Sequence, residues 1–486
     1  MTDSRRLILR SAWLGFALAG LFFYPLAAAI DSDPYYLQWQ PAHVAETWVA
    51  LLLLTMLFAG LVHLTWPRTT RSGNIALALV VLVPFLSLGA GVSRQLPIDD
   101  ALREAWESPT IRSAVPAAVA LFGAAAFVLW PRGFGRGLRG AVTAASPIAL
   151  VVVWSLLTST QAVPAIAIER TPPPSTARCP SVLALLFDEL SFAYLYDGTE
   201  VRPDFPQIRA FSGTATNHLR VRAPGDETLV SIPGYLAGQA FDNIRVEGDH
   251  LDYERGTTRA VFKANAPDGL FATARRAGYS PEAVGYYFPY CDMLGSLVDA
   301  CRSFSFYNVA TASPGFSPLH PVMTTLILWP RQFPLGLLKN PPFARLQRAL
   351  VEETYAFAVR PLPASRPAFR FVHFSVPHLP FVFGPDGYDP PFNPLRARPD
   401  TAYVAQVHYV DRLFGEVLAQ LQRSGSLDRT TIVLFADHGF RSGGQEQNSR
   451  HIPFMVRTAG QRSRTDVTDD EGGERLLHAL VRQCAP

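Results

Sequence analysis

The sequence predicts an α/β protein in two parts, an N-terminal bundle of five transmembrane helices and an α/β sandwich with a largely parallel sheet. Three observations lead to this fold class. Long apolar runs with few charges fill the first 160 residues. A proline-rich stretch, Thr171–Pro180, follows and marks a boundary. Beyond it, apolar runs of strand length alternate with amphipathic helical patterns, which is typical of a parallel sheet covered by helices.

We therefore expect a transmembrane domain at residues 1–165, a linker at 166–180 and a globular α/β domain at 181–486. The second domain is long enough to bury a sizeable core. The net charge of +3 provides no basic footprint of the kind that nucleic-acid-binding proteins carry. We expect no nucleic-acid partner.

The transmembrane domain is predicted from the length of its apolar segments. A helix that crosses about 30 Å of hydrocarbon needs about 20 apolar residues. The first segment is too long for a cleaved signal peptide and lacks a convincing cleavage site. The five candidate spans are Leu7–Ala29, Val44–Trp66, Asn74–Ser93, Ala114–Trp130 and Ala141–Thr160.

The arginines between these spans predict their orientation. They precede the first span, separate the second from the third, and separate the fourth from the fifth. These residues are Arg5, Arg6, Arg10, Arg68, Arg71, Arg132, Arg136 and Arg139. The 31–43 loop has no Lys or Arg, and the 94–112 loop offsets its arginines with acidic residues. We expect a multi-pass protein of a bacterial inner membrane whose second domain, residues 181–486, lies outside the cytoplasm.

The four cysteines all follow the apolar part, and none forms a C-x-x-C pair. An even number outside the membrane fits disulfides in an oxidising compartment. The preferred pairs are Cys291 with Cys301 and Cys179 with Cys484. Four unpaired, buried thiols are the alternative.

The second part contains two apolar runs that read as strands buried on both faces, Ser181–Phe187 and Thr431–Ala436. An apolar stripe of helical period runs through Ala402–Arg423, and Gly425 provides the C-terminal stop. These patterns predict the strands and helices of the sandwich.

Both strand-like runs end in acidic residues. Asp188 and Glu189 follow the first, and Asp437, His438 and Gly439 follow the second. In open α/β sheets, ligands bind beyond the carboxyl ends of the strands. Carboxylate and imidazole ligands without thiolate suit zinc or manganese, with calcium or magnesium less favoured. The alternative is that each aspartate merely forms a turn or caps a helix.

The segment Phe435–Gly439 resembles the C-terminal metal motif of the sulfatase branch of the alkaline phosphatase superfamily. The helix before it and Leu270–Gly285 fit the same family, so the resemblance runs with gaps from about residue 181 to 457. Five spans followed by such a domain are similar to lipoteichoic-acid synthases and lipid A phosphoethanolamine transferases. The resemblance implies an alkaline-phosphatase-like sandwich and a divalent metal, zinc first. Asp188, Glu189, Asp437, His438 and Thr228 are its expected ligands, and whether Asp188 or Glu189 is the first ligand stays open.

The same resemblance identifies a nucleophile. Glu227–Pro233 is similar to the T-x-x-S-x-P pattern of the phosphoethanolamine transferases, which makes Thr228 the attacking residue. Gly238 falls where sulfatases close their nucleophile helix. A divalent cation can activate a hydroxyl that is otherwise a poor nucleophile. The alternative is that Thr228 or Ser231 only caps this helix.

One departure separates this sequence from sulfatases that mature a Cys or Ser to formylglycine. Their C/S-x-P-x-R pattern needs an arginine where this chain has Tyr235, and position 228 is threonine. A threonine instead suits a covalent phospho-enzyme in a two-step transfer.

Two histidines complete the expected site. His378 lies between prolines and resembles the substrate-binding or second-metal histidine of the family. His451 falls where relatives have a residue that faces the substrate, although a packed or surface role fits equally well. Either histidine is a candidate general acid. His373 is interpreted as structural, and Arg450 as a weak candidate for phosphate binding.

The predicted function is transfer of a phospho-alcohol group, of phosphoethanolamine or phosphoglycerol type, from a membrane lipid to an envelope glycan or lipid. A hydrolase on the same site, either a phosphodiesterase or a sulfatase, is the first alternative. A catalytically silent envelope-assembly protein is the second.

Overall fold

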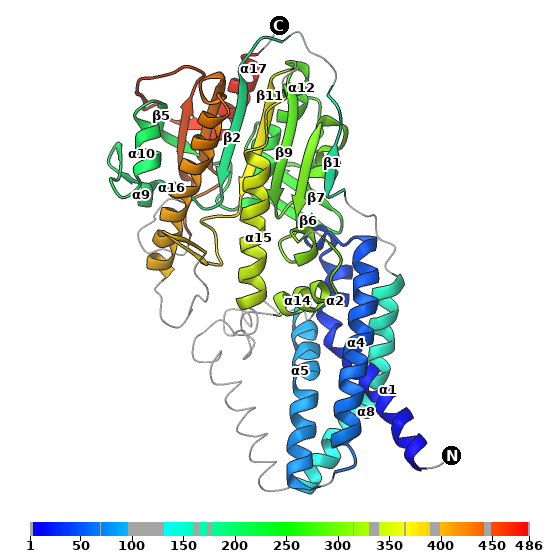
Figure 1. Cartoon of the computed structure of the whole chain (residues 1–486). Helices are drawn as coiled ribbons and strands as arrows, with labels where there is room; N and C mark the ends of the chain where they lie inside the picture. Colours follow the sequence, from blue (N-terminus) through cyan, green and yellow to red (C-terminus); the bar gives the residue numbers. More distant parts are fainter. Residues whose placement is uncertain are drawn as a thin grey trace. The chain divides into compact units, whose positions relative to one another are not determined.

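The computed structural model describes residues 3–68, 70–95, 131–158, 165–172, 177–313, 315–329, 340–363, 366–388, 399–441 and 449–484. The chain divides into two compact units (Figure 1). Unit 1 comprises Met1–Val163 and Tyr307–Phe343, and unit 2 comprises Pro164–Phe306 and Ala344–Pro486. The sequence had placed residues 307–343 inside the catalytic domain, whereas their contacts group them with the N-terminal helices.

Unit 1 is helical. Its helices are α1 (Asp3–Phe22), α2 (Tyr24–Ser32), α3 (Pro34–Leu37), α4 (Pro41–Thr65), α5 (Arg71–Gln95), α8 (Pro131–Thr158), the short η2 (Val309–Thr311) and α14 (Leu319–Ile327). Within the described residues, α4, α5 and α8 are each long and apolar enough to cross a membrane. They overlap the second, third and fifth predicted spans.

The first predicted span, Leu7–Ala29, is not one straight helix. It consists of α1 and α2, which meet at an angle of 49°. Pro25 in the first turn of α2 has no N–H to continue the α1 hydrogen-bond ladder, which explains the break. The fourth predicted span, Ala114–Trp130, lies outside the described residues, so the count of five stays a prediction.

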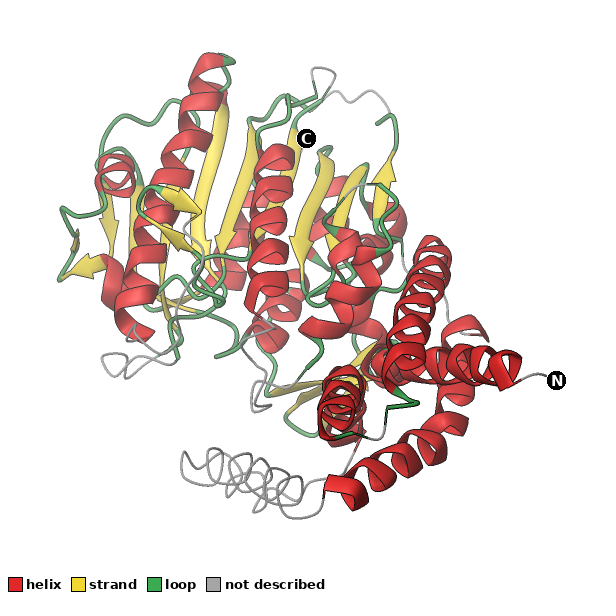
Figure 2. Cartoon of the chain, turned by 60° about the horizontal axis from the view of Figure 1, so that its bottom comes forward, coloured by secondary structure: helices red, strands yellow, loops and turns green. Residues whose placement is uncertain are grey.

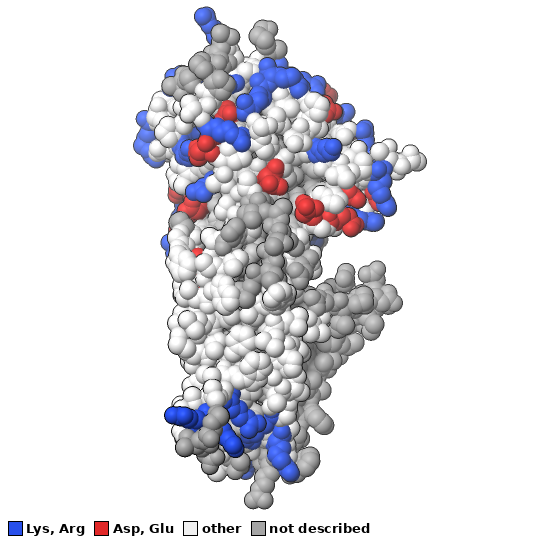
Figure 3. Space-filling model, turned by 90° about the vertical axis from the view of Figure 1, so that its right-hand side faces the viewer, with Lys and Arg blue, Asp and Glu red and all other residues white. Residues whose placement is uncertain are grey.

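The arginine side chains that the structure describes in unit 1 gather at one end of the bundle (Figure 3). Arg139 on α8 donates to the carbonyl oxygens of Trp66 at 3.1 Å and Arg68 at 2.9 Å. The Arg10 guanidinium lies 4.9 Å from the centre of the Trp66 ring. The helices that begin or end here therefore share one strongly basic end.

Unit 2 contains a ten-stranded sheet in the order β1-β10-β9-β11-β2-β14-β15-β5-β16, with β17 also paired to β5. Strands β10, β9, β11, β2 and β14 run parallel, which agrees with the predicted largely parallel sheet. The strands of this sheet are β1 (Ala167–Glu169), β2 (Ser181–Phe187), β5 (Thr216–Arg222), β9 (Ser280–Tyr286), β10 (Ala300–Phe304), β11 (Ala368–Phe374), β14 (Thr430–Ala436), β15 (His451–Arg457), β16 (Thr465–Val467) and β17 (Glu471–Gly472).

Smaller elements decorate this sheet. Three strands, β6 (Asn243–Glu247), β7 (His250–Arg255) and β8 (Thr258–Val261), form a separate antiparallel sheet. Two short hairpins pair β3 (Tyr196–Asp197) with β4 (Glu200–Val201) and β12 (Phe383–Gly384) with β13 (Gly387–Tyr388). The helices of unit 2 are α9 (Phe192–Leu195), α10 (Pro206–Ser212), α11 (Thr228–Ala237), α12 (Leu270–Arg276), α13 (Tyr290–Leu294), α15 (Asn340–Ala358), α16 (Pro399–Arg423) and α17 (Gly473–Arg482).

Helices cover both faces of the large sheet (Figure 2). Aromatic side chains pack in the layers between the helices and the sheet. On one face the ring of Phe271 in α12 packs against Phe371, whose ring contacts Phe435. On the other face Phe414 of α16 packs edge-on against Phe187. Side chains alternate across each strand, so strands with apolar residues at every position are buried on both sides.

Both preferred disulfides are present. Cys291 is bonded to Cys301, and Cys179 is bonded to Cys484. The second bond joins residues 305 positions apart and so ties the start of unit 2 to its last helix. The alternative of four free thiols is therefore wrong.

Candidate active site

The carboxyl ends of two neighbouring strands carry the candidate metal ligands. Asp188 directly follows β2, and Asp437 and His438 directly follow β14. Because β2 and β14 pair in parallel from Ser181 to Phe187, both ends lie at the same edge of the sheet. All three side chains are buried, and one ligand atom from each lies within 4.8 Å of the others.

Thr228 faces this group from the first residue of α11. Its Oγ1 donates a hydrogen bond to Asp437 Oδ2 at 2.7 Å. The same oxygen lies 3.4 Å from Asp188 Oδ1 and 3.3 Å from His438 Nε2. The hydroxyl is therefore surrounded by the three candidate ligands.

The backbone of α11 argues against a capping role for Thr228. Glu227 is the N-cap residue, with an extended backbone and no side-chain capping bond. Ser231, the other candidate cap, accepts a hydrogen bond from the backbone N–H of Gly225 at 3.1 Å. The helix ends at Gly238, whose φ of +71° is readily adopted only by glycine. The alternative reading of Thr228 as a cap is thus not supported.

The acidic side chains of the site are crowded in a buried place. Burial raises the pKa of Asp188 well above its usual range, and the nearby Asp437 carboxylate raises it further. Burial also raises the pKa of Glu189. Burial opposes ionisation of Asp437 as well, but the His438 and His373 imidazoles and several hydrogen bonds lower its pKa overall. The carboxyl groups of Asp188, Glu189 and Asp437 repel one another when all three are ionised. A bound cation would offset this repulsion.

The donor set fits a divalent metal. His438 Nδ1 lies 2.8 Å from the carbonyl oxygen of Gly439, so it carries the proton and leaves the Nε2 lone pair free. That Nε2 atom lies 3.5 Å from Asp437 Oδ2 and 3.8 Å from Asp188 Oδ1. Asp188, Asp437, His438 and the Thr228 hydroxyl are therefore the residues that would hold the ion, and Glu189 lies outside the group.

Glu189 occupies an unusual turn beside these ligands. Its φ of +64° lies in the left-handed region, which costs a non-glycine residue of order 1–3 kcal/mol. Tyr403 of α16 holds the turn, because its hydroxyl donates to the Glu189 carbonyl at 2.7 Å and accepts the Ser191 N–H at 3.0 Å. The Glu189 backbone N–H in turn binds Asp437 Oδ1 at 3.0 Å. The strained turn thus orients a candidate ligand.

The amino-acid sequence of this chain matches a known family model. The family model named Sulfatase matches residues 180–471, more than half of the 486-residue chain. The chain belongs to the sulfatase family. It is an enzyme of the alkaline-phosphatase-like sulfatase type, and such enzymes use a divalent metal. No functionally curated protein matches the sequence of this chain.

Several solved structures are similar to part of this chain. The carbohydrate complex of Ps i-CgsB has 14% identity and a TM-score of 0.43, covering 64% of this chain and 73% of that one. The phosphonate monoester hydrolase of Agrobacterium radiobacter has 17% identity and a TM-score of 0.40, covering 63% and 73%. The lipoteichoic acid synthase LtaP from Listeria monocytogenes has 12% identity and a TM-score of 0.38, covering 64% and 74%.

The other predicted site residues of this chain lie outside the ligand group. His378 follows β11 in a loop, with its Nδ1 2.7 Å from the carbonyl oxygen of Leu379. His451 begins β15, where its ring stacks on Phe192 at 4.0 Å and its Nε2 contacts the Leu219 carbonyl at 2.9 Å. The ring stacking and the carbonyl contact give His451 a structural role at the start of β15.

Arg450 also has a structural role. Its guanidinium donates to the carbonyl oxygens of Ala223 at 3.1 Å and Pro224 at 2.8 Å. Those residues belong to the loop that leads into α11. Arg450 therefore fixes this loop by hydrogen bonds to its backbone.

Several residues near the ligands were not expected. Tyr286, at the end of β9, donates a hydrogen bond to Asp188 Oδ2. His373, interpreted as structural, is fully buried with its Nε2 3.8 Å from the same oxygen. Tyr290 contacts His373 Nδ1 at 2.8 Å, and burial lowers the pKa of His373 to about 4. In the sequence, Tyr286 and His373 could be noticed only as residues near the ends of strand-like runs. Whether their side chains reach Asp188 depends on how β9 and β11 align with β2.

Arg441 is the other unexpected residue. It follows the metal motif and lies 3.5 Å from Glu189 Oε1 and 3.6 Å from Glu227 Oε2. Its side chain is 42% exposed, so it forms a basic rim beside the nucleophile. In the sequence, Arg441 could have been noticed because it lies four residues after Asp437. Many other arginines in the chain are exposed, so this position alone did not distinguish it.

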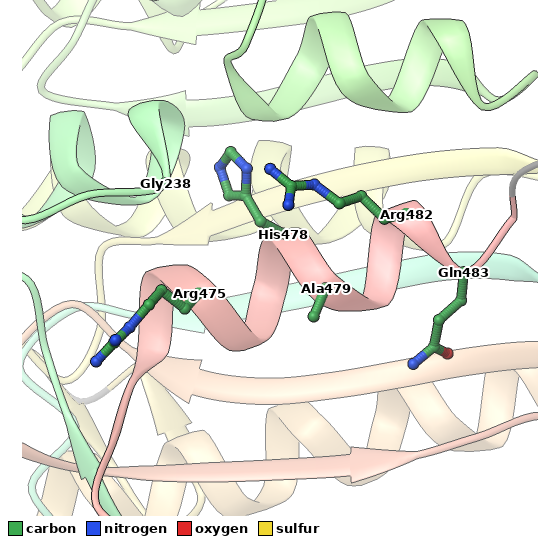
Figure 4. A pocket seen from close by; sticks show the side chains of 6 residues that line it. All are labelled: Gly238, Arg475, His478, Ala479, Arg482 and Gln483. Atoms are coloured by element: carbon green, nitrogen blue, oxygen red, sulfur yellow. The ribbon is translucent and has the colours of Figure 1, made fainter.

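A separate pocket of about 580 Å³ lies at the other end of α11. It is lined by Gly238 and by α17 residues that include Arg475, His478 and Arg482 (Figure 4). None of the candidate ligands lines it, so it is distinct from the catalytic group.

Proposed function

We propose that this sulfatase-family enzyme moves a phospho-alcohol group, of phosphoethanolamine or phosphoglycerol type, from a lipid donor to a cell-envelope acceptor. The observation that carries the proposal is Thr228, an ordinary hydroxyl placed 2.7 Å from Asp437 within the ligand group. A threonine attacks phosphorus directly and can hold a phospho-alcohol covalently between two steps. The membrane-length helices of the same chain favour a lipid as the donor.

The proposed reaction has two displacements. In the first, Thr228 Oγ1 attacks phosphorus, the bond from phosphorus to the lipid alcohol breaks, and His378 protonates the leaving oxygen. In the second, His378 takes the proton of an acceptor hydroxyl, whose oxygen attacks phosphorus and releases Thr228. Asp437 orients the Thr228 hydroxyl through its hydrogen bond, accepts its proton in the first displacement and returns it to Oγ1 when Thr228 is released in the second. A bound divalent cation would favour the deprotonated hydroxyl and offset negative charge on the phosphate oxygens.

The finer assignments belong to the same proposal. Zinc is the preferred ion, with manganese, calcium or magnesium as alternatives, because the group combines carboxylates with an imidazole. Five crossings of a bacterial inner membrane with an extracytoplasmic catalytic unit are favoured by the basic end of unit 1. The two disulfides fit an oxidising compartment.

Family membership favours a second candidate, a hydrolase of phosphodiesters or sulfate esters on the same site. A lipid assay separates the two. The purified full chain is incubated with phosphatidylethanolamine or phosphatidylglycerol labelled in the head group, with and without an envelope glycolipid acceptor. We expect labelled acceptor and free diacylglycerol. Label released only as free head group, at a rate that the acceptor does not change, would identify a hydrolase.

The proposed role of His378 predicts a selective loss. Replacing it with alanine should lower kcat by about 10²–10⁴-fold, the usual range for general acid–base catalysis. The loss should shrink for donors whose leaving group needs no proton, such as a nitrophenyl ester. His451→Ala is the matched control, because its stacking and carbonyl contacts predict a lower melting temperature with little change in kcat. Equal losses of kcat in both variants would contradict the assignment.

A further inference from the structure

A segment within the catalytic part of the sequence belongs to the helical unit. Residues 307–329 follow β10 of unit 2, yet they pack in unit 1. They contain no Asp, Glu, Lys or Arg, although these residues form 17% of the chain. We call residues 307–329 the insert. The insert therefore interrupts the sequence of unit 2 with a stretch that has no charged side chain, and this difference needs an explanation.

Polar contacts hold the insert on α4. Glu46 of α4 is 3% exposed, and its Oε1 accepts hydrogen bonds from the Ser317 backbone N–H at 2.9 Å and His320 Nδ1 at 3.0 Å. Asn308 Nδ2 donates to His43 Nδ1, also on α4, at 3.0 Å. A carboxylate in a membrane-length helix needs such partners, because burying it alone is costly.

The insert also contacts α5. The fully buried Trp329 donates to Ser87 Oγ at 3.1 Å, and that hydroxyl donates to the Phe22 carbonyl at 2.5 Å. Leu328 is part of the apolar core of unit 1, and Tyr307 packs against it. Both ends of the insert are therefore attached to the bundle.

These contacts place the insert at one membrane interface. Glu46 lies twenty residues before Trp66, a length of about 30 Å in a helix, which is the thickness of the hydrocarbon layer. Trp66 lies at the basic end of the bundle, where Arg10 and Arg139 contact it. Glu46 and the insert thus lie at the opposite end, which is the outer leaflet if the basic end is cytoplasmic.

The insert exposes apolar side chains of the kind that the spans expose. Phe316 is 61% exposed and Leu319 60%. Among the described residues, every other exposed large apolar side chain except Val261 lies on α1, α4, α5 or α8. Phe316 and Leu319 therefore extend the surface that faces lipid, and an apolar surface next to spans favours the acyl-chain boundary as its partner.

We propose that the insert is seated in the outer-leaflet interface, with Phe316 and Leu319 in contact with lipid, and that the lipid donor is taken up there. The first half rests on the contacts above. The second half rests on the proposed lipid-dependent function. In sequence, the insert starts directly after Phe306, whose ring lies 6.3 Å from that of Tyr286, the phenol that binds Asp188.

A labelling experiment tests the lipid contact without using activity. The four native cysteines are disulfide-bonded, so a single introduced thiol can be labelled with an environment-sensitive nitrobenzoxadiazole dye. The variants are F316C and L319C, with V261C as the matched exposed apolar control on β8. The full chain is reconstituted in vesicles of phosphatidylethanolamine and phosphatidylglycerol containing a doxyl-labelled lipid.

We expect the dye at positions 316 and 319 to emit at shorter wavelength, to be quenched by the doxyl lipid and to be protected from aqueous iodide. At position 261 the pattern should be reversed. Iodide quenching at 316 and 319 as strong as at 261, without doxyl quenching, would overturn the lipid contact. That result would show that the two side chains face water. Protection from both iodide and the doxyl lipid would also overturn the lipid contact, because it would indicate that another protein surface or a second copy covers the two side chains.

A kinetic comparison tests lipid uptake. In the double variant F316S/L319S, the ratio of turnover on vesicle lipid to turnover on a soluble nitrophenyl phosphodiester should fall by about tenfold, whereas V261S should keep it. An unchanged ratio in the double variant would overturn the uptake role. A wild-type chain that cleaves no phosphodiester would overturn the proposed function, while the labelling result would still stand.

Discussion

Replacing Thr228 with alanine is expected to lower kcat by about 10⁴-fold or more, because among the described residues no other hydroxyl lies against all three candidate ligands. The Thr228 hydroxyl is the one placed within 3.4 Å of Asp188, Asp437 and His438 together. Intact-protein mass spectrometry after brief incubation with lipid donor should show one added phospho-alcohol on the wild type and none on the variant. Thr228→Ser should keep the adduct at reduced turnover.

Ser231→Ala is the matched control for this experiment. Its hydroxyl lies on the same helix, is fully buried and binds the Gly225 N–H. Loss of that bond should reduce stability by about 1–3 kcal/mol, because a buried N–H loses its partner, while the adduct on Thr228 persists. An adduct that forms on Thr228→Ala, or that is absent from the wild type under every condition, would refute the nucleophile assignment.

Removal of the metal is expected to abolish activity and to lower the melting temperature, and Asp437→Asn should mimic both effects. An ion present at about 100 times its Kd stabilises the folded state by about 2.7 kcal/mol. In Asp437→Asn, the amide oxygen can keep the bonds from the Glu189 and His438 backbone N–H groups. The variant should therefore fold while losing a charged ligand atom, and its melting temperature should not respond to added metal.

Differential scanning calorimetry of the chelated protein, titrated separately with zinc, manganese, calcium and magnesium, measures this response and ranks the ions. Asp411→Asn is the control, since Asp411 is a buried carboxylate that binds the N–H groups of Gln207 and Ile208 outside the ligand group. It should melt at a lower temperature and still respond to metal. A metal response that survives in Asp437→Asn would contradict the ligand assignment.

The sequence revealed those parts of the site whose position follows from local pattern. Apolar runs located β2 and β14, and the residues after them, Asp188 and Asp437, had to share an edge once the strands paired in parallel. The nucleophile was found through its resemblance to a family motif. Tyr286 and His373 were not found, because their proximity to Asp188 depends on how β9 and β11 align with β2.

For unit 1, too, the sequence predicted the elements that have a local pattern and missed the contacts between distant residues. Hydropathy located α4, α5 and α8, but it does not register the break between α1 and α2, where Pro25 was the visible signal. The attachment of residues 307–329 to α4 was also missed. It depends on the pairing of Glu46 with His320, 274 positions away, and no local period reports such a contact.

The position of the insert has a consequence for biosynthesis. β2 carries Asp188 at its end, and its two sheet neighbours, β11 and β14, are both encoded after residue 343. Because synthesis runs from the N-terminus, the insert is made before either neighbour of β2. β2 therefore lacks both of its sheet neighbours until residues 368–374 and 430–436 have been made, and the edge that carries Asp188, Asp437 and His438 cannot form before then.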